Sequence, residues 1–303
     1  MLHLTSIVDL RAACDRARAD GRRVGLVPTM GFLHEGHRSL MRAARAETDF
    51  VVVTIFVNPL QFGAGEDLDR YPRNLGGDLA QCEAEGVDVV FAPTAAEMYP
   101  HGAPLTTVHV DGLTADLCGA ARPTHFDGVT TVVTKLFAIT GRCRAFFGRK
   151  DAQQLAVIAR MTADLNLPVD VVGCPIVREP DGLALSSRNA YLSAEERTAA
   201  LVLSRALETA SLLTGLGERH AATLTAKIRE VVATESLVDL EYVEVRDARE
   251  LTPLDEFGDD VEVLIALAAH VGATRLIDNV TIAIRGGEAT ADLGKRSQGA
   301  TSQ

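Results

Sequence analysis

Short apolar runs alternate with amphipathic stretches over the first part of the chain. Four runs have the composition of strands: Val24 to Val27, Asp49 to Val57, Val87 to Phe91, and Val169 to Val177 with a bend at Gly173 and Pro175. Nearly continuous runs rich in β-branched residues are typical of strands buried on both faces of a parallel sheet. Repeated strand and helix units of this kind predict an α/β domain with right-handed crossovers.

Helical spacing of apolar residues separates these strands. It predicts helices over Ile7–Ala19, from near His34 through Ala44, over Asp78–Glu85, up to Thr140, and over Gln154–Asn166. A short alternating segment, Thr106–Val110, indicates one small extra strand.

The pattern changes after residue 176. Two amphipathic helices in series are expected between Glu195 and Ser236, and a capping box of Ser193 with Glu196 precedes the first. Strands are expected at Leu240–Val245 and Val261–Ala268. We therefore predict a domain of residues 1–176, a smaller α+β domain of residues 177–285 and, from its Gly, Ser and Thr content, a disordered tail at 286–303.

Composition narrows the class of protein. The 303 residues are 47% apolar and carry 41 acidic against 30 basic side chains, a net charge of −11, which argues against a general nucleic-acid surface. No apolar run approaches the roughly 20 residues that span a bilayer, and Met1 to Arg11 does not resemble a signal peptide, so we expect a cytoplasmic protein. The five scattered cysteines are expected to be reduced thiols without a metal role.

The first strand runs into Pro28, which cannot donate a ladder hydrogen bond, and then into Thr29-Met30-Gly31-Phe32-Leu33-His34-Glu35-Gly36-His37. A strand, a tight turn and a helix start suit phosphate binding, because the first helical amides are unpaired and partly positive. His34 and His37 are three residues apart and share a helix face. A surface turn with two incidental histidines and a zinc-binding pair are the alternatives, although the His-Glu-x-x-His spacing is absent.

Polar residues also follow other strands. Asn58 and Gln61 come after the second strand, at the sheet edge where α/β proteins bind ligands, but they equally fit a capped, solvated loop. Lys150 lies in a glycine-led turn before a helix, where a solvated lysine is the usual case. Ser186-Ser187-Arg188 suits phosphate oxygens, or it is a plain linker.

Taken together, these motifs resemble those of the pantothenate synthetase family, within the H-x-G-H nucleotidyltransferases. Pro28-Thr29-Met30-Gly31 with His34-Glu35-Gly36-His37 resembles its opening motif, and Asn58-Pro59-x-Gln61-Phe62 its second. Phe147-Gly148-x-Lys150-Asp151-x-Gln153-Gln154 and Ser186-Ser187-Arg188-Asn189 follow in the family's order, and Arg275 to Asn279 resembles its closing segment.

The resemblance implies a Rossmann-like parallel sheet with helices on both faces and a C-terminal α+β lid domain. It implies a pantoate–β-alanine ligase that condenses (R)-pantoate with β-alanine through a pantoyl adenylate, using ATP and Mg²⁺ and releasing AMP and pyrophosphate. A homodimer is also implied, while the expectation of no nucleic-acid and no membrane partner comes from the charge and hydropathy given above.

The resemblance carries over residue by residue. The implied catalytic residues are His34, His37, Lys150 and Arg188. The implied ATP contacts are Met30, Gly31, Phe32, Leu33, His34, Glu35, Gly36, His37, Gly148, Arg149, Lys150, Asp151, Val177, Leu185, Ser186, Ser187 and Arg188. The implied pantoate or β-alanine contacts are Met30, Asn58, Gln61 and Gln154. Asp78 is expected near the metal or, from the sequence, as a helix N-cap.

Three departures from the family pattern affect this assignment. Thr124 replaces the usual glycine of Arg-Pro-Gly-His-Phe, and it would be strained if that position has positive φ, which also places substrate contact by Arg122 in question. Arg149 replaces a glutamate and adds positive charge, and Leu185 replaces a methionine. The competing hypotheses are a nucleotidylyltransferase that stops at the nucleotide conjugate and a catalytically inactive nucleotide-binding regulator. The chain lacks the Gly-x-Ser-x-Gly, Walker A and Gly-x-Gly-x-x-Gly motifs.

Overall fold

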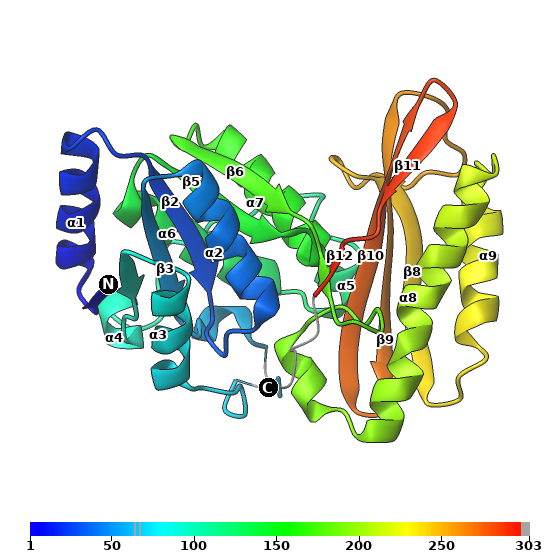
Figure 1. Ribbon diagram of the computed structural model, residues 1–303, viewed down its shortest axis with the longest axis horizontal. Coiled ribbons are helices and arrows are strands. Elements are labelled where there is room, and N and C mark those ends of the chain that lie inside the picture. Colours follow the sequence, from blue (N-terminus) through cyan, green and yellow to red (C-terminus); the bar gives the residue numbers. More distant parts are fainter. Residues whose placement is uncertain (64, 67, 298–303) are drawn as a thin grey trace. The chain divides into compact units, whose positions relative to one another are not determined.

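The computed structural model describes residues 1–63, 65–66 and 68–297, and the chain divides into two compact units (Figure 1). Unit 1 comprises residues 1–148 and 153–174, and unit 2 comprises residues 149–152 and the chain from Pro175 onward. The predicted boundary after residue 176 is close to the observed one. The sequence did not indicate that the turn at 149–152 belongs with the second unit.

Unit 1 contains a six-stranded parallel sheet. Its strands are β1 (Leu2–Leu4), β2 (Val24–Thr29), β3 (Phe50–Ile55), β4 (Val89–Phe91), β5 (Cys143–Gly148) and β6 (Val169–Cys174). They lie in the order β1-β4-β3-β2-β5-β6, and every pairing among them is parallel. The predicted parallel α/β sheet is confirmed.

The helices predicted for unit 1 are present and begin and end within a few residues of the predicted positions, and three short helices among the described residues were not predicted. In chain order the helices are α1 (Ile7–Ala19), α2 (Glu35–Glu47), η1 (Pro59–Gln61), α3 (Leu75–Ala84), α4 (Ala95–Met98), α5 (Cys118–Ala121), α6 (His125–Thr140) and α7 (Ala152–Asp164). Each of the strands β2, β3 and β5 leads directly into one of the polar turns singled out in the sequence.

Successive residues of the strands enter different cores. Leu26 and Val52 pack in one apolar cluster, whereas Val27 and Val53 pack in another, because neighbouring side chains of a strand point to opposite faces. The first cluster includes α1 and α6, and the second includes α2 and α3. Helices therefore cover both faces of the sheet, as expected.

Unit 2 is an α+β unit, as predicted. Its elements are η2 (Arg149–Asp151), β7 (Val177–Arg178), η3 (Ser187–Tyr191), α8 (Ala194–Gly215), α9 (Ala221–Val232), β8 (Val238–Asp247), β9 (Val261–Val271), β10 (Thr274–Arg285), β11 (Glu288–Asp292) and β12 (Lys295–Arg296). The antiparallel sheet has the order β11-β10-β9-β8, and helices α8 and α9 contribute the apolar side chains that cover it. The capping box of Ser193 and Glu196 is confirmed.

Two predictions of local structure were wrong. Thr106–Val110 is not a strand, because threonine side chains of α6 bond the main chain of Val108 instead: its amide donates to Thr131 Oγ1 at 3.0 Å and its carbonyl accepts from Thr130 Oγ1. The disorder predicted from residue 286 is wrong as far as residue 297. There β11 pairs with β10 and β12 pairs with β7, while residues 298–303 lie outside the described part.

No helix in the described ranges has the length and hydropathy needed to cross a bilayer. All five cysteines are free thiols. Burial raises the pKa of Cys14 to about 11 and the pKa of Cys82 and Cys143 to about 12, so these three are unreactive core side chains near neutral pH.

Candidate active site

The turn after β2 reverses direction through two residues with positive φ, Gly31 at 85° and Phe32 at 51°. A Cβ atom on residue 31 would lie 3.0 Å from a carboxylate oxygen of Asp78, so glycine is needed here for both conformation and space. Asp78 is 2% exposed and accepts the amide hydrogens of Phe32 and Leu33 at 2.9 and 2.7 Å. One buried carboxylate therefore fixes the turn that leads to the two histidines.

Asp78 is therefore not the N-cap of α3, whereas its expected place near the metal stays a prediction. The N-cap of α3 is Asn74, whose side chain accepts from the amide of Gly77. Both Asp78 oxygens are already bonded to main-chain amides. Over the described ranges, no group of three or more His, Cys, Asp or Glu side chains is arranged to hold a metal ion.

The two histidines of the motif form a reciprocal cap at the start of α2. His34 Nδ1 accepts from the amide of Gly36 at 3.1 Å, and the His34 amide donates to His37 Nδ1 at 3.3 Å. A ring nitrogen that accepts a hydrogen bond carries no proton, so in both neutral rings the proton lies on Nε2. The ring centroids are 4.1 Å apart. The turn thus sets two adjacent Nε2 donors at a helix N-terminus, where anions are favoured.

Gln61 belongs to a buried polar cluster behind this turn. Its Nε2 contacts Met30 Sδ at 2.9 Å, and its Oε1 accepts from Asn58 Nδ2 at 3.2 Å. Asn58 is 1% exposed, and its amide also donates to the Gly128 carbonyl and accepts from the Leu60 amide and the Tyr99 hydroxyl. Burial raises the pKa of Tyr99 to about 12, so this hydroxyl remains a donor. Asn58 therefore caps η1 and orients Gln61, and its own polar atoms are committed within the protein.

Helix α6 holds the main chain of Gln61 from the other side. A Cβ atom on Gly128 would lie 2.4 Å from the Leu60 carbonyl, so only glycine allows this approach. The Gln61 carbonyl accepts from Arg122 at 3.2 Å and from His125 Nδ1 at 2.9 Å. These contacts fix the backbone from which the Gln61 side chain extends.

The strain expected at Thr124 if its φ were positive is absent. Thr124 has φ −101° and ψ −4°, an ordinary right-handed conformation, so the residue is not strained. Arg122 donates to both carboxylate oxygens of Glu66, at 2.7 and 2.6 Å. The hydrogen bond from Arg122 lowers the pKa of Glu66, so the pair remains ionised. Arg122 is engaged in holding the loop.

Of the two glutamines that open α7, the first is structural. Gln153 accepts from the Cys118 amide at 3.0 Å and donates to the carbonyls of Leu113 and Asp116, each at 2.8 Å. It is 7% exposed, whereas Gln154 beside it is half-buried. Gln154 remains the candidate for substrate contact.

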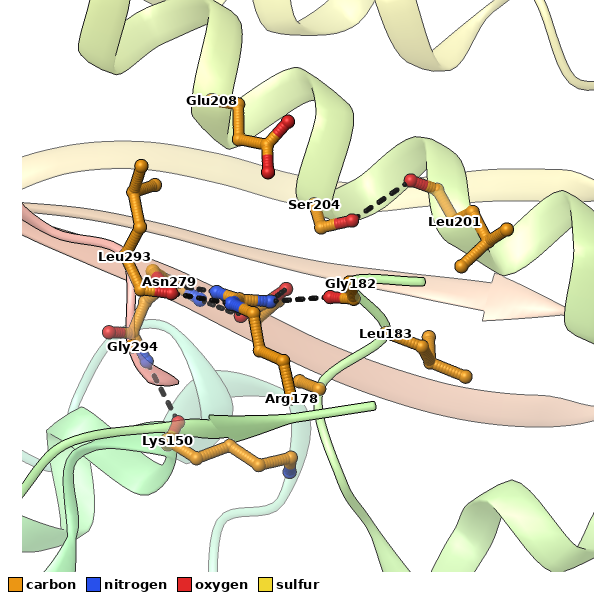
Figure 2. A network of polar contacts seen from close by, with 12 residues as sticks. Lys150, Arg178, Gly182, Leu183, Leu201, Ser204, Glu208, Asn279, Leu293 and Gly294 are labelled. Carbon is orange, nitrogen blue, oxygen red and sulfur yellow. Dashed lines mark hydrogen bonds and ion pairs between the residues drawn. The ribbon is translucent and has the colours of Figure 1, made fainter. Parts of the chain in front are cut away.

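In unit 2 the turn that carries Lys150 is bonded to β10. The side-chain amide of Asn279 donates to the carbonyl of Arg149 at 3.0 Å and to that of Lys150 at 2.8 Å. Figure 2 shows the bond to Lys150. The Arg149 guanidinium lies 3.9 Å from the Glu262 carboxylate, which offsets the extra positive charge. Lys150 itself is half-buried. This network explains why residues 149–152 group with unit 2.

The serine-rich motif lies at the end of a hairpin in unit 2. The Leu185 amide donates to the Val177 carbonyl at 3.0 Å, so Leu185 contributes its main chain to the hairpin, in line with its replacing methionine at little cost. Ser186 then caps η3, with its Oγ accepting from the Arg188 amide at 3.2 Å. A hydroxyl that accepts in this way can still donate its own hydrogen. Ser186, Ser187 and Arg188 thus form an ordered start of a 3₁₀ helix.

Within unit 1 the structure brings together the histidine pair with its turn, and Met30 with Gln61 and Asn58. Within unit 2 it gathers the Lys150 turn, and separately Ser186 to Arg188. Sequence reasoning missed the residues that hold these groups, chiefly Tyr99, Gly128, Arg178 and Asn279. For Asn279, one signal was present: it ends the segment from Arg275 that resembles the family's closing motif, although nothing in the sequence indicated which residues it bonds.

Comparison with known proteins shows the family to which this chain belongs. The profile of the family "Pantoate-beta-alanine ligase" matches residues 3–281. The chain is 57% identical over 281 residues to the pantothenate synthetase of Heliobacterium modesticaldum, covering 93% of this chain and 99% of that one. It is 51% identical over 279 residues to the pantothenate synthetase of Geobacter sulfurreducens, covering 92% and 98%.

Two solved structures extend the match to the fold. The pantothenate synthetase of Thermus thermophilus has a TM-score of 0.85 at 46% identity, with 92% of this chain and 98% of that chain covered. A pantoate-beta-alanine ligase of Francisella tularensis, complexed with beta-gamma ATP and beta-alanine, has a TM-score of 0.73 at 32% identity, with 92% and 97% covered. Because profile, sequences and folds agree over nearly its whole length, this chain belongs to the pantoate-beta-alanine ligase family.

Proposed function

We propose that this protein condenses (R)-pantoate with β-alanine at the expense of ATP, giving pantothenate, AMP and pyrophosphate. Family membership across residues 3–281 supports the reaction, as does the relative complexed with a form of ATP and with β-alanine. The structural observation that carries the proposal is the reciprocal cap of His34 and His37, in which each Nδ1 accepts a main-chain amide, so that in the neutral rings each Nε2 is a donor at the N-terminus of α2.

In the first step a pantoate carboxylate oxygen attacks the α-phosphorus of ATP and the bond to pyrophosphate breaks. Negative charge then grows on the bridging and non-bridging oxygens, and prearranged donors lower the barrier. We assign this stabilisation to His34, His37, Lys150 and Arg188, with hydroxyl donation from Ser186 and Ser187. We propose that His37 acts through the hydrogen bond of its Nε2–H group and keeps that proton, because its Nδ1 accepts from the His34 amide and the neutral ring has no second proton to give.

In the second step the β-alanine amine attacks the acyl carbon of pantoyl adenylate. The C–N bond forms, the bond to AMP breaks, and the amine loses a proton. We propose that Gln61 and Gln154 hold pantoate through its polar groups and that Met30 lines its binding site. Neutral amides orient hydroxyl groups without adding charge beside the phosphates. We assign the side chain of Asn58 a supporting role, because its amide group already makes four hydrogen bonds within the protein.

The remaining assignments of the nucleotide site follow the family. We propose that the main chain of residues 30–37 and of 148–151, with Val177 and Leu185, contacts ATP. Mg²⁺ is proposed to arrive with the nucleotide, since it is usually held by substrate phosphates and water. The described residues do not offer it a carboxylate cluster, and we assign it no protein ligand. From family membership we also propose a cytoplasmic homodimer.

The test is release of AMP and pyrophosphate from ATP, Mg²⁺ and (R)-pantoate, with and without β-alanine. We expect sustained AMP formation only when both acids are present. A nucleotidylyltransferase would form product without the amine, and an inactive regulator would bind ATP without releasing pyrophosphate. Either result, from protein shown to be folded, would refute the proposed reaction.

A further inference from the structure

Asn279 is buried where its neighbours on the same face are not. In β10 the even-numbered residues Leu276, Val280 and Ile282 pack in the core with α8 and α9, so Asn279 points to the opposite face. Other residues on that face, such as Ile277 and Thr281, are half-buried, whereas Asn279 is 3% exposed. The element that bonds to it is the η2 turn.

The Asn279 side chain makes two hydrogen bonds to that turn. A carboxamide nitrogen has two hydrogens, and they go to the consecutive carbonyls of Arg149 and Lys150, at 3.0 and 2.8 Å. Fixing two successive carbonyls fixes the orientation of the peptide between them, and with it the direction in which the Lys150 side chain leaves the main chain. Figure 2 shows this side chain extending from the turn, with its amine away from the bonded carbonyl.

A buried ion pair holds Asn279 in turn. The main-chain amide of Asn279 donates to Asp278 Oδ1 at 2.8 Å. The Asp278 carboxylate also accepts two hydrogen bonds from the Arg178 guanidinium, at 2.7 and 3.0 Å. The side chains of Arg178 and Asp278 are only 5% and 3% exposed. Buried charges are tolerated only when paired and hydrogen-bonded. This pair therefore locks the central segment of β10.

All five N–H groups of Arg178 have partners. Besides Asp278, they reach the carbonyls of Leu293 at 2.6 Å, Gly182 at 3.1 Å and Asn279 at 3.4 Å. Gly182 lies in the turn that Figure 2 shows beside Arg178. This turn is the tip of a hairpin whose second arm leads to Ser186. One guanidinium thus fixes both the strand segment beneath the Lys150 turn and the hairpin that leads to Ser186, Ser187 and Arg188.

We propose that Asn279 is a positioning residue for Lys150, and that the Arg178–Asp278 pair keeps the Lys150 turn in register with the Ser186–Arg188 segment as one phosphate-binding body within unit 2. This inference rests on the proposed function for the role of Lys150. The placement of the turn by Asn279 stands on geometry alone. The mechanism predicts that Asn279 acts on ATP only through Lys150.

The first test is amide hydrogen exchange in Asn279→Leu, which keeps the approximate volume and removes both donors. We expect faster exchange confined to residues 149–153, with the β8–β9 ladder unchanged. Thr214→Ala is the control, because it removes another buried hydrogen bond of unit 2, to the Ala210 carbonyl at 2.9 Å. In the control we expect no faster exchange at residues 149–153. The proposal would be overturned if Asn279→Leu left exchange at residues 149–153 unchanged, or if it raised exchange throughout unit 2.

The second test is a double-mutant cycle with Lys150→Ala, read as AMP formation and as the Kd for ATP with Mg²⁺. Asn279→Leu alone should lower AMP formation by about tenfold or more, since displacing a catalytic group by about 1 Å can cost on the order of 100-fold. In the Lys150→Ala background it should change either quantity by less than about twofold. Equal losses in both backgrounds would show that Asn279 does not act through Lys150.

Two provisions keep the outcome decisive. If Asn279→Leu does not fold, Asn279→Asp keeps the side-chain shape while removing the donors, and the same measurements apply. If the wild-type protein forms no AMP, the proposed function fails, but hydrogen exchange and the ATP-binding cycle still decide the role of Asn279.

Discussion

The two turns that carry the candidate phosphate-binding groups are held in opposite ways. In unit 1 the carboxylate of Asp78 accepts hydrogen bonds from two consecutive amides, those of Phe32 and Leu33. In unit 2 the carboxamide of Asn279 donates hydrogen bonds to two consecutive carbonyls, those of Arg149 and Lys150. Each turn follows a parallel strand and precedes a helix, and each is fixed by one buried side chain from a distant part of the chain.

The difference lies in what supports that side chain. Asp78 sits in α3 and bonds the turn directly, whereas Asn279 is fixed by a buried ion pair that also holds a second loop. Removing the Asp78 carboxylate should therefore disturb only the turn that it bonds. Removing the Arg178–Asp278 ion pair should disturb both the Lys150 turn and the hairpin that leads to Ser186. Substitutions of aspartate by asparagine can separate the two cases, because they keep the shape and remove the charge.

The largest effect is expected for Asp278→Asn. Neutralising Asp278 leaves the buried Arg178 charge without its partner, which costs about 3 to 5 kcal/mol of unfolding free energy. Urea unfolding of unit 2 measures this loss of unfolding free energy. The matched control is Asp164→Asn, which removes the partner of Arg160 in an exposed ion pair and should change the unfolding free energy by less than about 0.5 kcal/mol. A loss at Asp278 no larger than in the control would mean that the pair does not support β10.

Asp78→Asn should have a smaller effect, confined to unit 1. One of the two bonded amides would face an N–H₂ group in place of an oxygen, and an unsatisfied buried donor costs about 1 to 3 kcal/mol. We expect this loss in urea unfolding, together with slower AMP formation, since the turn orients His34 and His37. Wild-type stability and activity in this variant would show that the turn holds its shape without Asp78.

Thr124→Gly restores the residue usual in the family and should bring no benefit. Because Thr124 already has a right-handed φ and its side chain is exposed, the added freedom of the unfolded chain lowers the unfolding free energy by about 0.5 kcal/mol. AMP formation should stay at the wild-type rate. Faster turnover or greater stability would indicate that threonine does strain this loop.

The smallest effect is expected for the exposed His109, which joins the segment before α5 to the first turn of α6. Hydrogen bonds to Asp127 and then Asp111 raise the pKa of His109 above its ordinary value. Because the pKa of His109 is higher in the folded than in the unfolded state, its protonated form adds to the free energy of unfolding. This contribution is complete below the unfolded-state pKa of about 6.5 and is lost as the pH rises through the pKa of the folded state. His109→Gln should therefore lower Tm slightly at pH 5.5 and leave it unchanged at pH 9, whereas an equal shift at both would exclude this linkage.

The sequence predicted what depends on local pattern. Runs such as Phe50–Ile55 are strands in the sheet, and Ile7–Ala19 forms a helix with the predicted ends. The three-residue strand β1 was too short to give a pattern, and β11 was hidden because its composition resembles a flexible tail. Pairing with β10 outweighs that composition, which only the folded chain reveals.

The same distinction applies to the candidate site. Motif residues such as His34, Gln61 and Lys150 could be named from their order along the chain. The residues that hold them could not, because Asp78 bonds a turn 46 residues away and Asn279 bonds one 130 residues away. An isolated aspartate in a helix reads as a cap, and its true partners appear only when the chain is folded.

The measurement that tests the central claim most directly is the fate of the pantoate carboxylate oxygen. With (R)-pantoate labelled with ¹⁸O in its carboxylate, attack on the α-phosphorus followed by amine attack on the acyl carbon leaves one labelled oxygen in AMP. We predict one ¹⁸O in the phosphate of AMP and none in pyrophosphate. Unlabelled AMP, or label appearing in inorganic phosphate, would contradict the acyl-adenylate route and with it the roles assigned to both turns.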